Sequence, residues 1–166
     1  MMQHLIGRRL PDAELPATSG SAVNGAKLQG PAVIFCYPWT GRPGHANPPH
    51  WDDIPGAHGS TPQALAYSDV YGEFRRLGVK LFGLSLQDTP WQQEFVKRNS
   101  LSYRLLSDAQ RKFSGRLGLP LFETGGVDYI QRLTIVAQDG IIRHLRYPIK
   151  TPEADASETL ALIQPR

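Results

Sequence analysis

The sequence contains a single cysteine, Cys36, among its 166 residues. One thiol cannot form an intramolecular disulfide, so a disulfide-stapled secreted scaffold is excluded and a reducing compartment fits the chain. The sequence also lacks an apolar run that approaches the ~20 residues of a membrane-spanning helix. Its first residues lack the apolar stretch of a secretory signal peptide. These absences predict a cytoplasmic protein without a membrane partner.

A large excess of acidic or basic residues is absent as well. Eighteen Lys and Arg face fifteen Asp and Glu, which leaves a formal net charge of +3. The basic residues come in pairs rather than in blocks, and they are not interleaved with stacking aromatics, as nucleic-acid grooves require. Solvated helix faces explain this pattern, so we expect no nucleic-acid partner.

The length fits one domain, 1–166, because domains cluster near ~100–150 residues. Proline is concentrated in one region. Six of the fourteen prolines lie between residues 38 and 62: Pro38, Pro43, Pro48, Pro49, Pro55 and Pro62. The 41–59 segment is predicted to be a loop inside the domain, since coherent elements flank it closely. Loops longer than ~12–15 residues in compact domains are often functional.

Hydrophobic periodicity and turn residues predict alternating strands and helices. The apolar run 31–37 predicts a buried strand, and Asp139-Gly140 predicts the turn of a hairpin. The predicted strands are 31–37, 79–85, 103–106, 129–137 and 141–147. The predicted helices are 61–77, 89–99, 109–117 and 154–163. This order predicts an α/β fold with a central mixed sheet flanked by helices.

A helix is predicted to begin near Ser60, after the proline-rich loop. Ser60 or Thr61 can cap it, and Pro62 suits the first helical position. The start of a helix offers unpaired backbone N–H groups and the positive end of the helix dipole. Such a position can stabilise a thiolate or another anion.

The segment Tyr37-Pro38-Trp39-Thr40, the long loop and Gly59-Ser60-Thr61-Pro62-Gln63 together resemble a known active site. They are similar to the active-site strand, loop and helix of the peroxiredoxins (AhpC/TSA family), above all the Q-type, bacterioferritin-comigratory-protein-like branch. The resemblance implies a single thioredoxin-like domain and thiol-dependent reduction of hydroperoxides in cell redox homeostasis. It implies a thioredoxin-type reductant, a monomer or homodimer, and neither a cofactor nor a metal.

The resemblance also implies roles for individual residues. Ser60 stands where the family has its peroxidatic cysteine, and Leu65 stands at the resolving-cysteine position five residues later. Arg132 matches the late-strand arginine that supports the reacting oxygens. Pro38 matches the proline that shields the pocket, and Thr40 is the nearest match for the supporting threonine.

The match of Thr40 departs from the family pattern, because about twenty residues separate it from Ser60. Ala57 stands where the usual close spacing would place the threonine.

A serine in the nucleophile position predicts that peroxidase activity is impaired or lost, since peroxide reduction requires a thiolate that passes through sulfenic acid. Either Ser60 is the natural residue at this position, or it has been substituted for a natural cysteine. Leu65 and the lack of cysteines in the loop favour natural divergence. Two alternatives stay open: a non-catalytic domain that binds a hydroperoxide, another small ligand or a partner at the Ser60 helix start, and a Ser60 hydrolase with His58 as base.

Cys36 is predicted to be a small buried hydrophobe, because it lies within an apolar strand. His45, His50 and His58 lie in the loop near two aspartates, but their spacing matches no short metal-ligand motif, so no metal site is expected. Trp39 and Trp51 flank the loop. They either anchor it by packing or form the wall of a ligand or partner site.

Overall fold

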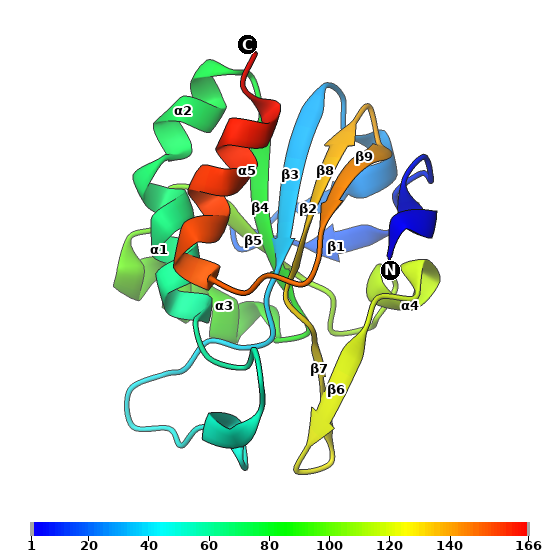
Figure 1. The fold of residues 1–166 in the computed structure, drawn as a ribbon. Helices are drawn as coiled ribbons and strands as arrows, with labels where there is room; N and C mark the ends of the chain where they lie inside the picture. Colours follow the sequence, from blue (N-terminus) through cyan, green and yellow to red (C-terminus); the bar gives the residue numbers. More distant parts are fainter. Residues whose placement is uncertain (1, 166) are drawn as a thin grey trace.

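The computed structural model describes residues 2–165, which form a five-stranded sheet between layers of helices and hairpins (Figure 1). The order of strands across the sheet is β5 (Arg104–Ser107), β4 (Lys80–Ser85), β3 (Pro31–Cys36), β8 (Leu133–Gln138) and β9 (Ile141–Arg146). The pairs β3–β4 and β4–β5 are parallel, whereas β8 is antiparallel to both β3 and β9. The predicted mixed sheet is confirmed.

The central strand β3 is buried on both faces, which explains its unbroken apolar sequence. Val33 and Phe35 contribute to one core cluster, and Ile34 and Cys36 to the other. This alternation follows from the two-residue period of a strand. The first cluster lies under α1 (Ser60–Asp69), α2 (Tyr71–Arg76), α3 (Thr89–Asn99) and α5 (Asp155–Ile163).

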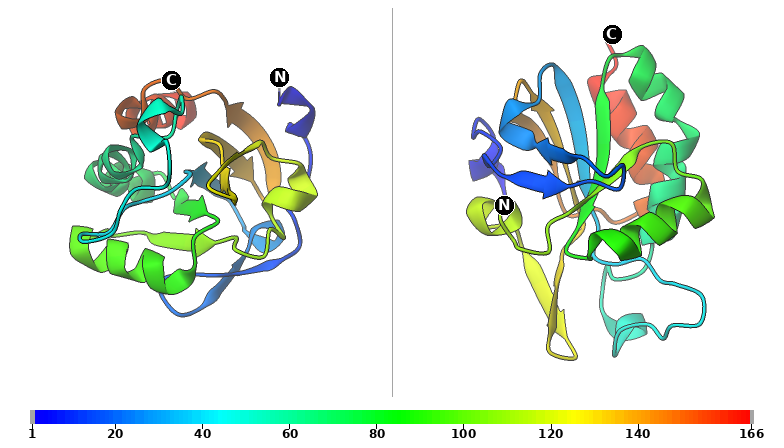
Figure 2. Two further views of the ribbon diagram at one scale, coloured as in Figure 1. Left: turned by 90° about the horizontal axis from the view of Figure 1, so that it is seen from below. Right: turned by 180° about the vertical axis from the view of Figure 1, so that it is seen from behind.

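The second cluster lies on the opposite face of the sheet. It is covered by β1 (Glu14–Pro16), β2 (Ala22–Asn24) and α4 (Ser114–Leu117). Figure 2 shows β1 and β2 crossing this face in the view from behind. Within residues 2–165, no helix combines the length and the apolarity that crossing a membrane requires.

Two predicted helices are shorter than the sequence pattern indicates. The helix predicted over 61–77 is divided into α1 and α2, because Val70 leaves the helical region with φ −107° and ψ 11°. The helix predicted over 109–117 is reduced to α4. Arg111 adopts a positive φ of 57°, which interrupts helical hydrogen bonding.

The strand predicted over 129–137 is also divided, into β7 (Val127–Ile130) and β8. The sequence analysis missed β6 (Leu121–Thr124), which pairs with β7 in a separate hairpin. The interruption between β7 and β8 contains Arg132. Arg132 therefore lies immediately before the first residue of β8 rather than within a strand.

The N-terminus of α1 differs in detail from the prediction. Gly59 is its N-cap, with a φ of 113° that favours glycine, so Ser60 is the first helical residue and Pro62 the third. Helix α3 begins at Thr89, as the sequence predicts. Asp88 caps it through a 2.8 Å hydrogen bond from the Trp91 backbone N–H to its Oδ1.

The 41–59 loop extends from the lower end of the sheet, near the β6–β7 hairpin (Figure 1). It contains a short 3₁₀ helix, Trp51–Asp53. The Trp51 ring is buried against Trp39, Phe122 and Tyr129, with centroid distances of 5.5, 5.7 and 5.2 Å. This aromatic cluster anchors the loop.

Candidate functional site

Ser60 and Arg132 meet at the N-terminus of α1, although 72 residues separate them in the sequence. Nη1 of Arg132 donates a hydrogen bond to Ser60 Oγ at 3.2 Å and another to Gln63 Oε1 at 2.6 Å. Each of the three side chains is at least 96% buried. A guanidinium thus faces the first turn of the helix, where the dipole already favours negative charge.

The other terminal nitrogen of Arg132 holds the end of the loop. Nη2 donates to the backbone carbonyl oxygens of Gly56, Ala57 and His58 at 3.1–3.2 Å. Burial lowers the pKa of Arg132 to about 10, and the negative charge of Asp155 opposes that shift. The guanidinium therefore keeps its charge at neutral pH.

A buried carboxylate lies behind this pair. Asp155, the first residue of α5, is fully buried and accepts hydrogen bonds from four elements of the fold. The donors are Gln63 Nε2, Tyr67 Oη, Thr134 Oγ1, Thr159 Oγ1 and Arg146 Nε, at 2.7–3.2 Å. Because Nε2 of Gln63 points to Asp155, its Oε1 points to Arg132. Asp155 therefore orients the glutamine that contacts the arginine.

The sequence analysis missed both Gln63 and Asp155. Gln63 lies within the quoted Gly59–Gln63 motif, so its position one turn after Ser60 was an available signal. No sequence signal separates Asp155 from the other acidic residues at helix starts, because its donors come from distant segments.

Ser60 lines a cavity of about 520 Å³ at the start of α1. The cavity extends along residues 57–62, with Trp39, Trp51 and Asn47 on its walls. The two tryptophans whose role the sequence left open therefore do both things: they pack against each other and they border this cavity.

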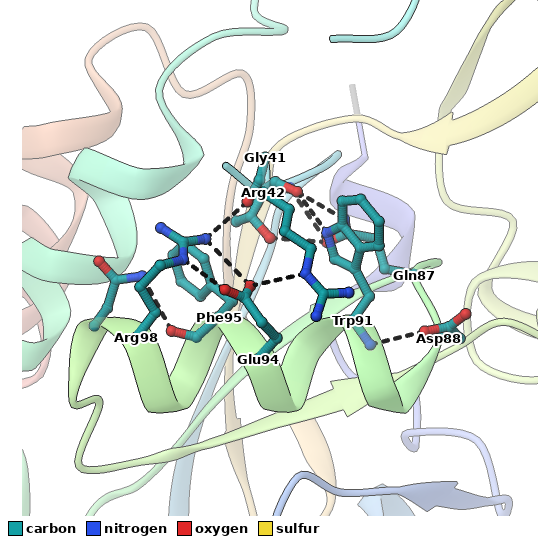
Figure 3. Close-up of polar contacts among 10 residues, drawn as sticks. Gly41, Arg42, Gln87, Asp88, Trp91, Glu94, Phe95 and Arg98 are labelled. Atoms are coloured by element: carbon teal, nitrogen blue, oxygen red, sulfur yellow. Dashed lines mark hydrogen bonds and ion pairs between the residues drawn. The ribbon is translucent and has the colours of Figure 1, made fainter. Parts of the chain in front are cut away.

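Thr40 is held by a different part of the fold. Its backbone N–H and its hydroxyl donate to Gln87 Oε1, both at 3.2 Å, and its carbonyl oxygen accepts from Trp91 Nε1 at 2.7 Å. Figure 3 shows Gln87 and Trp91 at this point, and the neighbouring Gly41 carbonyl accepting from Arg98. Within residues 2–165 no hydrogen bond joins Thr40 to Ser60 or Arg132, although its neighbours Trp39 and Gly41 line the Ser60 cavity.

The two remaining predicted site residues are Pro38 and Leu65, and neither lines the Ser60 cavity. Pro38 is buried and lines a second cavity, together with Trp39. Leu65 is on α1 with 38% of its surface exposed. Ala57, at the position where close spacing would place the threonine, contributes its backbone carbonyl to Arg132 instead of a side chain.

Cys36 is fully buried in β3, as the sequence predicts. Burial raises the pKa of the Cys36 thiol far above its ordinary value, and the negative charge of Asp108 raises it further. A buried thiol that stays protonated is a poor nucleophile, so Cys36 is not placed for redox chemistry with a substrate.

The His58 ring is paired with Asp52, and His58 lines the same cavity as Ser60. Its Nε2 lies 2.5 Å from Asp52 Oδ1, and both side chains are more than half exposed. Within residues 2–165 no hydrogen bond joins the His58 ring to Ser60, and no group of three or more His, Cys, Asp or Glu residues is arranged to hold a metal ion.

Comparison with known proteins assigns the chain to a family. The model of the Redoxin family matches residues 5–163. The chain is 29% identical over 159 residues to "Peroxiredoxin Q, chloroplastic" of Oryza sativa subsp. japonica, covering 95% of this chain and 66% of that one. It therefore spans slightly less than two thirds of that relative's length. It is also 29% identical over 163 residues to "Peroxiredoxin Q, chloroplastic" of Sedum lineare, covering 95% and 77%.

Solved structures share the fold. The Mycobacterium tuberculosis peroxidoxin BcpB superposes with a TM-score of 0.74 at 24% identity, covering 96% of this chain and 98% of that one. The Xanthomonas campestris bacterioferritin comigratory protein superposes with a TM-score of 0.73 at 22% identity, covering 92% and 93%. The chain belongs to the Redoxin family, is similar to Q-type peroxiredoxins and has the thioredoxin-like α/β fold.

Proposed function

We propose that this redoxin has lost thiol-dependent peroxide reduction and uses the pocket at Ser60 to bind a small oxygen-bearing ligand. The observation that carries the proposal is the 3.2 Å hydrogen bond from Arg132 Nη1 to Ser60 Oγ in the position of the family nucleophile. A hydroxyl replaces the thiol there, while the charged support behind it is present.

The chemistry of serine supports the loss of peroxidase activity. Reduction of a hydroperoxide transfers two electrons from a thiolate sulfur, which becomes sulfenic acid, and a hydroxyl oxygen has no equivalent oxidation step. Within residues 2–165, the side-chain hydrogen bond that Ser60 makes comes from a guanidinium, which only donates and cannot act as a base. This arrangement disfavours the hydrolase alternative, because a serine nucleophile needs a base within hydrogen-bond reach.

The polar groups at the pocket favour a ligand with an acceptor oxygen. Ser60 Oγ accepts from Arg132, so its own proton is available to a ligand in the adjoining cavity. The start of α1 adds backbone N–H groups and a positive dipole. The tryptophan walls suit an apolar body. A hydroperoxide, its alcohol product or a small carboxylate combines these features, and the family membership favours the first two.

The first experiment is a coupled peroxidase assay with thioredoxin, thioredoxin reductase and NADPH, using hydrogen peroxide and cumene hydroperoxide. We expect no turnover above the protein-free blank for the natural sequence. Turnover at rates typical of enzymes, above ~1 s⁻¹, would overturn the loss of activity. Ser60→Ala serves as the matched control, because it removes the hydroxyl and keeps the helix start.

Ligand binding is measured separately, by tryptophan fluorescence during titration with cumyl alcohol and benzoate. We expect saturable quenching that Ser60→Ala weakens, because Trp39 and Trp51 border the cavity. Unchanged fluorescence with both compounds would count against the binding role. The cytoplasm remains the compartment we propose, since the single buried thiol requires no oxidising environment.

A further inference from the structure

A second cavity, of about 220 Å³, lies beside the Ser60 site between the end of β3, the start of α3 and β7. Its lining combines three aromatic and several apolar residues with the carboxylates of Asp88, which is exposed, and Asp128, which is half-buried. The residues are Pro38, Trp39, Leu86, Gln87, Asp88, Trp91, Val127, Asp128 and Tyr129. Lys, Arg and His are absent from this lining. The Ser60 cavity shares a single residue with it, Trp39.

The aromatic walls are held in place by the fold. The Trp39 and Trp91 rings lie 6.3 Å apart between centroids, inclined by 36°. Trp91 is fixed by the hydrogen bond from its Nε1 to the Thr40 carbonyl (Figure 3). The Arg42 guanidinium already lies 5.7 Å from the centroid of the Trp91 ring without lining the cavity. An indole in this position therefore contacts a cation within the protein itself.

The two carboxylates of the lining each keep one oxygen free of hydrogen bonds within residues 2–165. Asp88 uses Oδ1 to cap α3, and Asp128 uses Oδ2 to accept from Arg111 Nη1 at 2.8 Å. The second oxygen of each side chain has no recorded partner. The cap and the ion pair offset part of this negative charge, so a bound cation would be held by the aromatic faces and the carboxylates together.

We propose that this cavity binds an alkylammonium group, such as the quaternary ammonium of a choline-like molecule or of a methylated lysine. Aromatic faces attract such a cation through the ring quadrupole, and carboxylates add charge complementarity. The chemistry is opposite to that of the Ser60 cavity, where donors and a guanidinium favour an acceptor. The inference therefore does not depend on the function proposed for Ser60.

The test uses the three tryptophans as separate reporters in the 166-residue chain. Indole N–H signals are recorded by ¹H–¹⁵N NMR and assigned with single Trp→Phe variants. The chain is titrated with choline and with its neutral isostere, 3,3-dimethyl-1-butanol. We expect choline to shift the Trp39 and Trp91 signals saturably, and the neutral compound to bind at least about tenfold more weakly.

Two conservative variants test whether each carboxylate contributes to binding of the cation. Asp88→Asn keeps a residue type that caps helices and removes one charge, and Asp128→Asn does the same at β7. We expect each to weaken choline binding by about three- to tenfold. Asp69→Asn, on the exposed end of α1, is the matched control and should leave binding unchanged.

Three results of these titrations would overturn the proposal. Equal binding of choline and its neutral isostere would overturn the proposal, because the cavity would then be merely apolar. Absence of shifts at about 50 mM choline, or equal effects of all three Asp→Asn variants, would overturn it as well. Parallel titrations with choline and with trimethyl-lysine peptides distinguish a small-molecule source of the ammonium group from a protein source.

Discussion

The Ser60 hydroxyl lies 3.2 Å from Nη1 of Arg132, and Nη2 of the same guanidinium holds three carbonyl groups of the loop that leads to Ser60. Arg132 thus places a positive charge at the pocket and also holds the loop in position through hydrogen bonds. The three hydrogen bonds to the loop give Arg132 a structural role that does not depend on a thiol at position 60. This relationship gives several measurable consequences.

Ser60→Cys should create a thiol with a pKa below the ordinary value of ~8.5, because the helix start and the Arg132 charge both favour the thiolate. The measurement is the pH dependence of iodoacetamide alkylation. The natural protein is the control. Its buried Cys36 should react only after unfolding, since burial raises the pKa of that thiol. An alkylation midpoint at or above ~8.5 in the variant would show that Ser60 is not the anion-stabilising position.

The double variant Ser60→Cys/Leu65→Cys should form a disulfide after peroxide treatment only if α1 unwinds. Helix geometry places Cα atoms five residues apart at roughly 8–9 Å, and a disulfide needs less than about 7 Å. We expect loss of far-ultraviolet helical signal in step with disulfide formation, and recovery on reduction. Rapid disulfide formation with an unchanged spectrum would contradict the position of both residues on one helix.

Arg132→Lys should destabilise the fold by about 2–4 kcal/mol, measured by urea unfolding. The ammonium cannot reach the five acceptors that the two terminal nitrogens of Arg132 contact, so buried polar groups lose their partners. Arg76→Lys is the matched control, because its pair with Glu73 is exposed on the surface. The control should change stability by less than about 0.5 kcal/mol. Equal effects of the two substitutions would contradict the loop-fixing role.

Stability should fall as the pH rises above about 10. Burial raises the pKa of Tyr37, Tyr67 and Tyr103 in the folded protein, with the charge of Asp155 adding to the shift at Tyr67. In the unfolded chain these phenols lose their protons near pH 10, while the folded protein keeps them, so the unfolded state binds fewer protons above that pH. The folded state is then progressively disfavoured.

The check is tyrosine absorbance near 295 nm, followed together with circular dichroism. Half of the six tyrosines should ionise only as the fold is lost. Tyr103→Phe should reduce the alkaline loss of stability. Ionisation of all six tyrosines in one transition, with the fold intact, would contradict this prediction.

Local sequence patterns predicted the sheet and most of its strands because these elements depend on burial and on turn chemistry. The apolar run of β3 and the Asp139-Gly140 turn can be identified from the sequence alone. Helix boundaries were less accurate. The interruption of α1 and α2 at Val70 and the positive φ of Arg111 reflect packing that no short window contains.

The candidate site could be predicted only in part. Ser60 and Arg132 were named from a motif resemblance, and the structure places them in hydrogen-bond contact. Thr40 was named in the same way, and its hydrogen bonds are with Gln87 and Trp91. Its role at the pocket stays a prediction.

The sequence by itself determined the lone thiol and the helix start near Ser60, because these depend on residue identity and local backbone chemistry. Tertiary structure alone decided that Arg132, Gln63 and Asp155 form one buried hydrogen-bonded chain beneath Ser60. The physical reason is that side-chain hydrogen bonds depend on distances in space. Packing of α1 and α5 against the sheet brings both helices close to β8, although the three elements are far apart in the sequence.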